Sequence, residues 1–134
     1  MERIAQCACG SLRAIASGDP ARAYVCHCRA CQRRTGSVVH VGAYYLREQV
    51  RVEGAAKVFT RAGTSGADLR FQFCPECGST VVWYADKYPD RIGVAIGCFA
   101  DPDFPVPTLS VWEEGMHEWL GLPPGLDRYK QAPA

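Results

Sequence analysis

The sequence predicts a mostly-β fold, and three features of its 134 residues support this prediction. Short runs rich in β-branched and aromatic residues recur along the chain, and each run is closed by Gly, Pro, Asp or Ser. In residues 70–73 the aromatic and polar side chains alternate, which is the period of a strand with one buried face. Only residues 28–34 have a helical pattern of any clarity.

The expected strands follow one another along most of the chain. Short segments around Leu12, Ile15, Tyr24 and Val25 come first, and residues 38–45 combine β-branched with aromatic side chains, as a central strand does. Further strands are predicted at residues 57–61, 68–73, 80–84 and 91–97. The Gly-Thr-Ser-Gly sequence at residues 63–66 is expected to form the loop of a hairpin.

Helical structure is expected in two short places. The first is residues 28–34, where Gly36 would end the helix, and the second is a single turn at residues 46–49. Beyond Asp101 the prolines favour extended backbone, because the proline ring fixes φ and removes a hydrogen-bond donor.

The chain length fits one domain, and we predict a single domain over residues 1–134. Its core is expected at about residues 4–122, followed by a surface tail at residues 123–134, where Pro123, Pro124 and Gly125 occur. No repeat, low-complexity tract or linker interrupts the sequence.

The charge balance and hydropathy exclude several classes of partner. Fifteen basic and 14 acidic residues give a net charge of +1, which argues against nucleic acid or an anionic membrane as the main partner. No apolar stretch approaches the roughly 20 residues of a membrane span, and the first residues lack the apolar run of a secretion signal. We therefore expect a cytoplasmic protein, whose eight cysteines stay reduced and serve metal binding or catalysis.

The sequence Cys74-Pro-Glu-Cys77-Gly78 has the form of a zinc knuckle. Two sulfurs three residues apart reach one ion if the chain turns sharply; Pro75 favours that turn, and Gly78 tolerates the positive φ that follows it. A structural zinc site needs four ligands, and the knuckle supplies two of them.

Cys7 and Cys9 are the expected complement to the knuckle. Residues i and i+2 of an extended segment point to the same side, so both sulfurs can face one ion. Cys7, Cys9, Cys74 and Cys77 are therefore predicted to hold one structural zinc ion. The alternative is that Cys7 and Cys9 are buried apolar residues without a metal.

Cys26, Cys28 and Cys31 form the third cluster, at the point where a strand gives way to the predicted helix. Their spacing lets three sulfurs meet, and three protein ligands leave one position open, as in a catalytic zinc site. Other interpretations stay open at this stage. Cys98, His27 or His40 could close the site as a fourth ligand, or the cysteines could be metal-free or partly oxidised thiols.

The residues around this cluster have competing interpretations too. His27 points away from its cysteine neighbours if the segment is extended, which suits a polar residue at the surface or behind the ligands. Cys98 fits a small buried residue. Arg33 and Arg34 are either the solvated face of a short helix or the contacts for the carboxylates of an anionic thiol substrate.

The three cysteine clusters, in this order, resemble the glutathione-dependent formaldehyde-activating enzymes of the GFA/CENP-V family. The resemblance runs from about residue 4 to residue 122. It includes residues 26–37 (Cys-His-Cys-Arg-Ala-Cys-Gln-Arg-Arg-Thr-Gly-Ser), the Phe73-Cys74-Pro75 start of the knuckle, residues 86–90, Gly97, Asp101 and Trp119. It implies an Mss4-like fold of several coiled β-sheets around a structural zinc on Cys7, Cys9, Cys74 and Cys77, and a second, catalytic zinc on Cys26, Cys28 and Cys31.

The resemblance also implies a reaction, the condensation of formaldehyde with glutathione to S-(hydroxymethyl)glutathione. The leading hypothesis is thus a zinc-dependent carbon–sulfur lyase whose partners are a small glutathione-like thiol and a small aldehyde. The alternative is a non-enzymatic Mss4-like zinc module that binds a protein. A third hypothesis, methionine sulfoxide reductase chemistry, would need Cys98 as the nucleophile, although Gly97 and Phe99 bring no charge to activate it.

Overall fold

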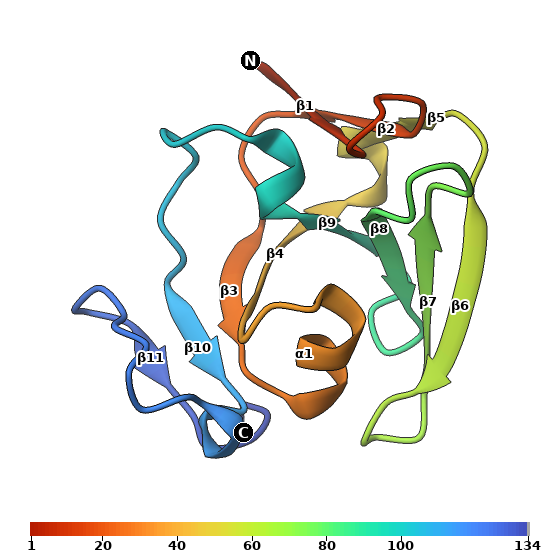
Figure 1. The fold of residues 1–134 in the computed structure, drawn as a ribbon. Helices are drawn as coiled ribbons and strands as arrows, with labels where there is room; N and C mark the ends of the chain where they lie inside the picture. The colour runs from red at the N-terminus through yellow and green to blue at the C-terminus, as the bar shows by residue number, and fades with distance from the viewer. Residues whose placement is uncertain (134) are drawn as a thin grey trace. The chain divides into compact units, whose positions relative to one another are not determined.

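The computed structural model describes residues 1–133, which form a mostly-β protein, as predicted. Figure 1 shows the strands together with the short helix α1 (Arg29–Thr35). The chain forms two compact units that alternate along the sequence. Unit 1 comprises residues 1–21 and 43–104, and unit 2 comprises residues 22–42 together with the segment that begins at Pro105.

Unit 1 contains a small antiparallel sheet. Its strands are β1 (Glu2–Gln6), β2 (Arg13–Ser17) and β5 (Val50–Glu53), with β2 in the middle. Ile4 lies opposite Ile15 and Ala14 opposite Val52 in the register of the ladder. The β1–β2 loop carries Cys7 and Cys9.

A second part of unit 1 is an antiparallel meander. Its strands are β6 (Lys57–Ala62), β7 (Asp68–Phe73), β8 (Thr80–Ala85) and β9 (Arg91–Ala95). All four strands were expected, and so was the loop at residues 63–66, where the Gly66 N–H donates to the Gly63 carbonyl. The register shifts between Gln72 and Phe73, so the pairing is interrupted just before Cys74.

The ends of two elements in unit 1 fold into short 3₁₀ turns. The expected turn at residues 46–49 is η1 (Arg47–Gln49). The strand expected at residues 91–97 ends earlier, at Ala95, and η2 (Ile96–Phe99) follows. The Ala100 N–H bonds to the Gly97 carbonyl, which closes a turn that alternation of side chains could not predict.

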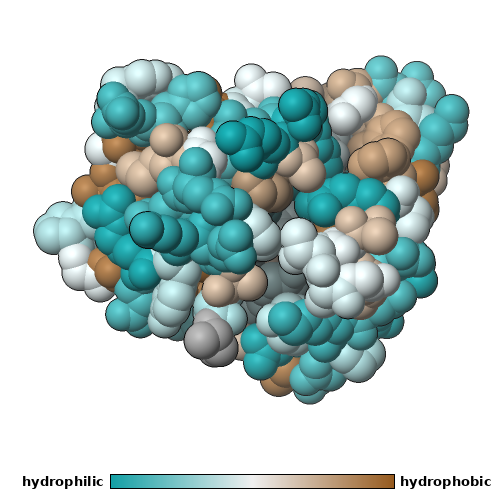
Figure 2. All heavy atoms as spheres, turned by 90° about the horizontal axis from the view of Figure 1, so that it is seen from below, coloured by the Kyte–Doolittle hydropathy of each residue, from teal (hydrophilic) through white to brown (hydrophobic). Residues whose placement is uncertain are grey.

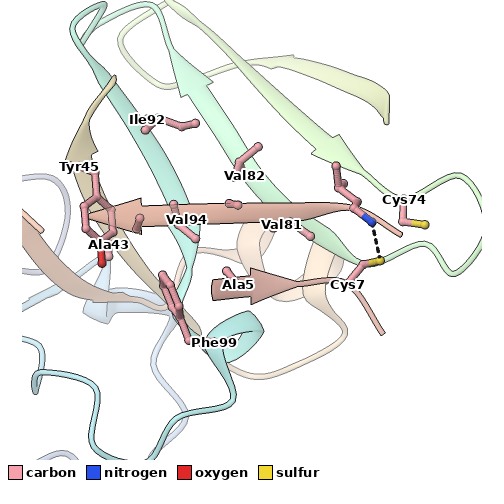
Figure 3. Close-up of a cluster of buried hydrophobic side chains, with 13 residues drawn as sticks. Ala5, Cys7, Ala43, Tyr45, Cys74, Val81, Val82, Ile92, Val94 and Phe99 are labelled. Carbon is pink, nitrogen blue, oxygen red and sulfur yellow. Dashed lines mark hydrogen bonds between the residues drawn. The ribbon is translucent and has the colours of Figure 1, made fainter. Parts of the chain in front are cut away.

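The core of unit 1 is the cluster of apolar side chains drawn in Figure 3. Val81, Val82 and Val94 from β8 and β9 pack with Tyr45 and the N-terminal strands, and all three valines are fully buried. Cys7 and Cys74 lie at one end of this cluster, where the Leu12 N–H donates to the Cys7 Sγ. One edge of the core therefore consists of thiol groups.

Unit 2 is built around a parallel ladder. β10 (Leu109–Val111) pairs with β3 (Arg22–Cys26) on one side and with β11 (Asp127–Arg128) on the other, and both pairings are parallel. Helix α1 (Arg29–Thr35) follows β3 and ends at Gly36, as expected. The segment expected as a tail is thus held by backbone bonds, among them Tyr129 N–H to the Ser110 carbonyl at 2.9 Å.

Two remaining elements complete the description. β4 (His40–Leu46) carries the chain from unit 2 into unit 1, and η3 (Glu113–Gly115) follows β10. Within residues 1–133, no helix combines the length and the apolar character needed to span a membrane. The face drawn in Figure 2 is mainly hydrophilic, with apolar residues in small groups.

Candidate metal centres

Four cysteines of unit 1 converge on one point. The β1–β2 loop provides Cys7 and Cys9, the β7–β8 loop provides Cys74 and Cys77, and their sulfurs all lie within 4.8 Å of one another. The Cys7–Cys9 and Cys9–Cys74 sulfur separations are both 3.6 Å. Sulfurs placed tetrahedrally about 2.3 Å from zinc would be about 3.8 Å apart, whereas a disulfide has a bond of about 2.0 Å. The donor set fits a zinc ion.

Each loop of this four-cysteine centre is closed by the N–H of the glycine that follows its second cysteine. The Gly10 N–H donates to the Cys7 carbonyl, and the Gly78 N–H donates to the Cys74 carbonyl, at 3.0 and 2.8 Å. Both glycines have positive φ, of 84° and 81°, a conformation that other residues adopt only with strain. Each turn brings its two sulfurs to the same side of the chain.

Two serines of the four-cysteine centre were missed in the sequence. The Ser11 hydroxyl lies 3.1 Å from the sulfurs of both Cys9 and Cys74, and the Ser79 hydroxyl lies 3.3 Å from the Cys77 sulfur. The Ser79 hydroxyl and its backbone N–H lower the pKa of Cys77 to about 5. The signal that could have revealed both serines is the triplet Cys-Gly-Ser, which occurs at residues 9–11 and again at residues 77–79.

Replacing Ser11 or Ser79 with alanine is expected to loosen the metal of this centre, because the thiolates lose a hydroxyl donor. We expect release to a coloured chelator to become about tenfold faster, within the range typical of groups that contact metal ligands. Ser65→Ala is the control, since its exposed hydroxyl in the β6–β7 loop accepts from the Ala67 N–H and lies in a loop that carries no cysteine. Release rates equal to that of Ser65→Ala would contradict the assigned role.

Three cysteines of unit 2 converge as well. Cys26 ends β3, Cys28 is the N-cap of α1 and Cys31 lies in its first turn. Their sulfurs lie within 4.8 Å of one another, with 3.7 Å between Cys26 and Cys31. That distance again suits shared zinc coordination, and the separate thiols show no disulfide. Within residues 1–133, no histidine, carboxylate or further cysteine joins this three-cysteine centre.

Burial divides the three-cysteine centre into an inner and an outer side. Cys26 and Cys31 are each 6% exposed, whereas Cys28 is half-buried. Hydrogen bonds with Cys28 and Cys31, together with burial, raise the pKa of Cys26. Without a cation this crowding disfavours thiolates, and a bound divalent cation reverses the preference. Of the three cysteines, Cys28 is the one most open to solvent.

The two arginines that follow this centre differ in their surroundings. Both lie in the last turn of α1, where Arg33 is exposed and Arg34 is half-buried. The hydrogen bond with Cys26 and the charge of Arg34 both act to lower the pKa of Cys31, but the hydrogen bond with Cys28 and burial outweigh them and raise it. Arg33 is available to solutes arriving from solvent.

The remaining candidate ligands lie elsewhere. His27 is fully buried and bonds through Nε2 to the Ser110 hydroxyl at 3.0 Å, so of the two positions expected for it the surface one is wrong. Burial lowers the pKa of His27, which favours the neutral ring. His40 is buried against the Tyr24 hydroxyl.

Cys98 is a half-buried thiol of unit 1 that belongs to neither centre. Its sulfur donates to the Thr80 carbonyl at 3.5 Å. Burial, with the nearby Cys7 and Cys77, raises the pKa of Cys98 to about 11. A thiol that holds its proton this firmly is a poor nucleophile, which counts against reductase chemistry at this residue.

Comparison with known proteins gives a family and a structural relative. The family model described as glutathione-dependent formaldehyde-activating enzyme matches residues 2–115. The crystal structure of a Rhodobacter sphaeroides protein is similar, with 25% sequence identity and a TM-score of 0.56 over 71% of this chain and 85% of that one. No curated protein matches the sequence significantly.

Proposed function

The chain belongs to the glutathione-dependent formaldehyde-activating enzyme family, and from this premise we propose that it is a zinc-dependent carbon–sulfur lyase. Its substrates would be a small thiol such as glutathione and formaldehyde or another small aldehyde. The observation that carries the proposal is the three-cysteine centre, which offers three sulfurs at the spacing of a zinc site and no fourth protein ligand within residues 1–133.

The two centres would have different tasks. Cys7, Cys9, Cys74 and Cys77 would hold a structural zinc, because four ligands complete its coordination. Cys26, Cys28 and Cys31 would hold a second zinc. When bound there, this ion supplies a free coordination position and favours the thiolate form of a substrate thiol, which makes it nucleophilic toward an aldehyde carbon.

The side chains around the three-cysteine centre suit this task. Cys26 and Cys31 are buried among Leu109 and Val111, which keep water from the inner side of the centre. Half-buried Cys28 leaves the outer side for substrate. Arg33 and Arg34 would bind the carboxylates of an anionic thiol such as glutathione, since guanidinium groups pair with carboxylates through two hydrogen bonds.

Cys28→Ser is the direct test of this function. We expect the rate of hemithioacetal formation from glutathione and formaldehyde to fall to the uncatalysed background, because two cysteines no longer retain the second ion. The protein should bind two zinc ions per chain before the change and one after it, with an unchanged circular dichroism spectrum.

Cys98→Ser is the matched control, because this cysteine belongs to neither centre. It should keep both ions and full activity. Equal, background-level rates for the wild type and Cys28→Ser would overturn the lyase proposal. One zinc per wild-type chain would instead favour the protein-binding module.

A further inference from the structure

His27 lies between two cysteines of the three-cysteine centre, and three of its polar groups are held by hydrogen bonds. Its N–H donates to the Val111 carbonyl at 3.1 Å, and its carbonyl accepts from the Gln32 side chain at 2.8 Å. The same Gln32 amide donates to the Gly115 carbonyl at 3.0 Å. The backbone that carries Cys26 and Cys28 is thus fixed against residues 111–115.

The His27 ring begins a chain of hydrogen bonds that ends near the C-terminus. Ser110 donates its single hydroxyl hydrogen to Glu113 at 2.6 Å, so its oxygen accepts from the His27 Nε2–H. Glu113 in turn accepts from Arg128 at 2.8 and 3.0 Å. Hydrogen bonds thus connect four side chains in the order Arg128, Glu113, Ser110 and His27.

We propose that this series of hydrogen bonds links residues 127–131 to the three-cysteine centre. His27 is the positioning residue, which holds Cys26 and Cys28 at the spacing that a metal ion needs. Arg128 fixes the carboxylate of Glu113, and Glu113 orients the hydroxyl of Ser110. Ser110 in turn holds the ring of His27, the residue that separates Cys26 from Cys28 in the sequence. Three ligands bind zinc less firmly than four, so their spacing must be set by the protein before the ion arrives. The inference deepens the proposed function, because it concerns the same second metal centre.

Two further observations support the inference. A Cβ added at Gly115 would lie 2.5 Å from the His27 carbonyl oxygen, so glycine is needed for this close approach. Backbone bonds from Trp112 to Gln131 and from Glu113 to Tyr129 attach the C-terminal segment along the same stretch.

Arg128→Gln tests the inference at the far end of the chain. We expect the second zinc to be retained about tenfold less firmly, as is typical when a partner of a metal-site residue is lost, while the first zinc stays bound. Arg70→Gln is the matched control, because Arg70 is 44% exposed against 52% for Arg128 and also pairs with a carboxylate, Asp86 in unit 1. Cobalt substitution would follow both centres, since thiolate–cobalt absorption reports the occupancy and symmetry of each.

His27 variants test the other end. Glutamine places its side-chain N–H near the position of the histidine Nε2–H, so His27→Gln should retain the second ion, whereas His27→Ala should lose it. Equal retention of the second ion in Arg128→Gln and Arg70→Gln would overturn the inference. If His27→Ala lost both ions equally, the inference would also be overturned, because His27 would then stabilise the whole protein and not the three-cysteine centre in particular.

The outcomes separate this inference from the lyase proposal. A wild-type protein that binds two ions without condensing thiol and aldehyde would refute the lyase, while the metal-retention results would still decide the role of Arg128. An active wild type whose Arg128→Gln variant keeps its second ion would refute the inference alone.

Discussion

Cys74→Ser is expected to abolish the cooperative unfolding transition of unit 1. Cys74 is fully buried at the end of the core and joins loops that are 65 residues apart in the chain. Structural zinc contributes about 10–16 kcal/mol of binding free energy in small domains, which matches or exceeds the total stability of roughly 5–15 kcal/mol typical of folded proteins. Losing one of four ligands therefore removes a large share of the stability.

Thermal unfolding followed by circular dichroism would measure this loss, with zinc and after chelation. The wild type with zinc should unfold in one sharp transition, and both the chelated protein and Cys74→Ser should lack it. Cys98→Ser, a half-buried cysteine outside both centres, is the control and should unfold like the wild type. A sharp transition that survives exhaustive chelation would contradict the structural role of the metal.

Gly54→Ala is expected to destabilise the protein by about 2–4 kcal/mol, the sum of a strained positive φ and an overpacked contact. Gly54 has a φ of 101°, and a Cβ there would lie 1.9 Å from the Ser11 carbonyl oxygen. The clash pushes on the turn between Cys7 and Leu12, whose backbone bonds shape the four-cysteine centre. Metal release from that centre should accelerate together with the loss of stability.

Gly66→Ala separates the two causes. Gly66 also has a positive φ, 86°, but a Cβ there meets nothing within 4 Å. Urea unfolding should therefore show a loss of about 1 kcal/mol for Gly66→Ala, the cost of backbone strain alone. Equal losses for the two variants would mean that the contact with Ser11 has no energetic effect.

Local sequence was enough to predict much of the fold. The strands β6, β7 and β8 have β-forming side chains between clear turn residues, and Gly36 stops α1 because its positive φ suits a helix end. The knuckle was predictable because Pro75 and Gly78 determine a turn within five residues. In each case the decisive contacts lie close together in the chain.

Contacts between distant residues were beyond such reasoning. β10 has only three residues, and its parallel pairing with β3 joins Leu109 to Tyr24, a partner that no local pattern identifies. His27 was expected either at the surface or behind the ligands, and its buried ring bonds to Ser110, a partner 83 residues away that no local pattern identifies. The division of the chain into two units follows from the same long-range pairings.

The alternation of the two units along the sequence sets an order for biosynthesis. Chains fold from the N-terminus as they leave the ribosome, and unit 1 is fully translated once Phe104 has emerged. The thiols of residues 26–31 emerge early, yet β10 and β11, which complete unit 2, are translated last. We therefore expect the nascent protein to load its four-cysteine centre first, and a chain whose translation stops after Phe104 would carry one ion while the thiols of Cys26, Cys28 and Cys31 stay without one.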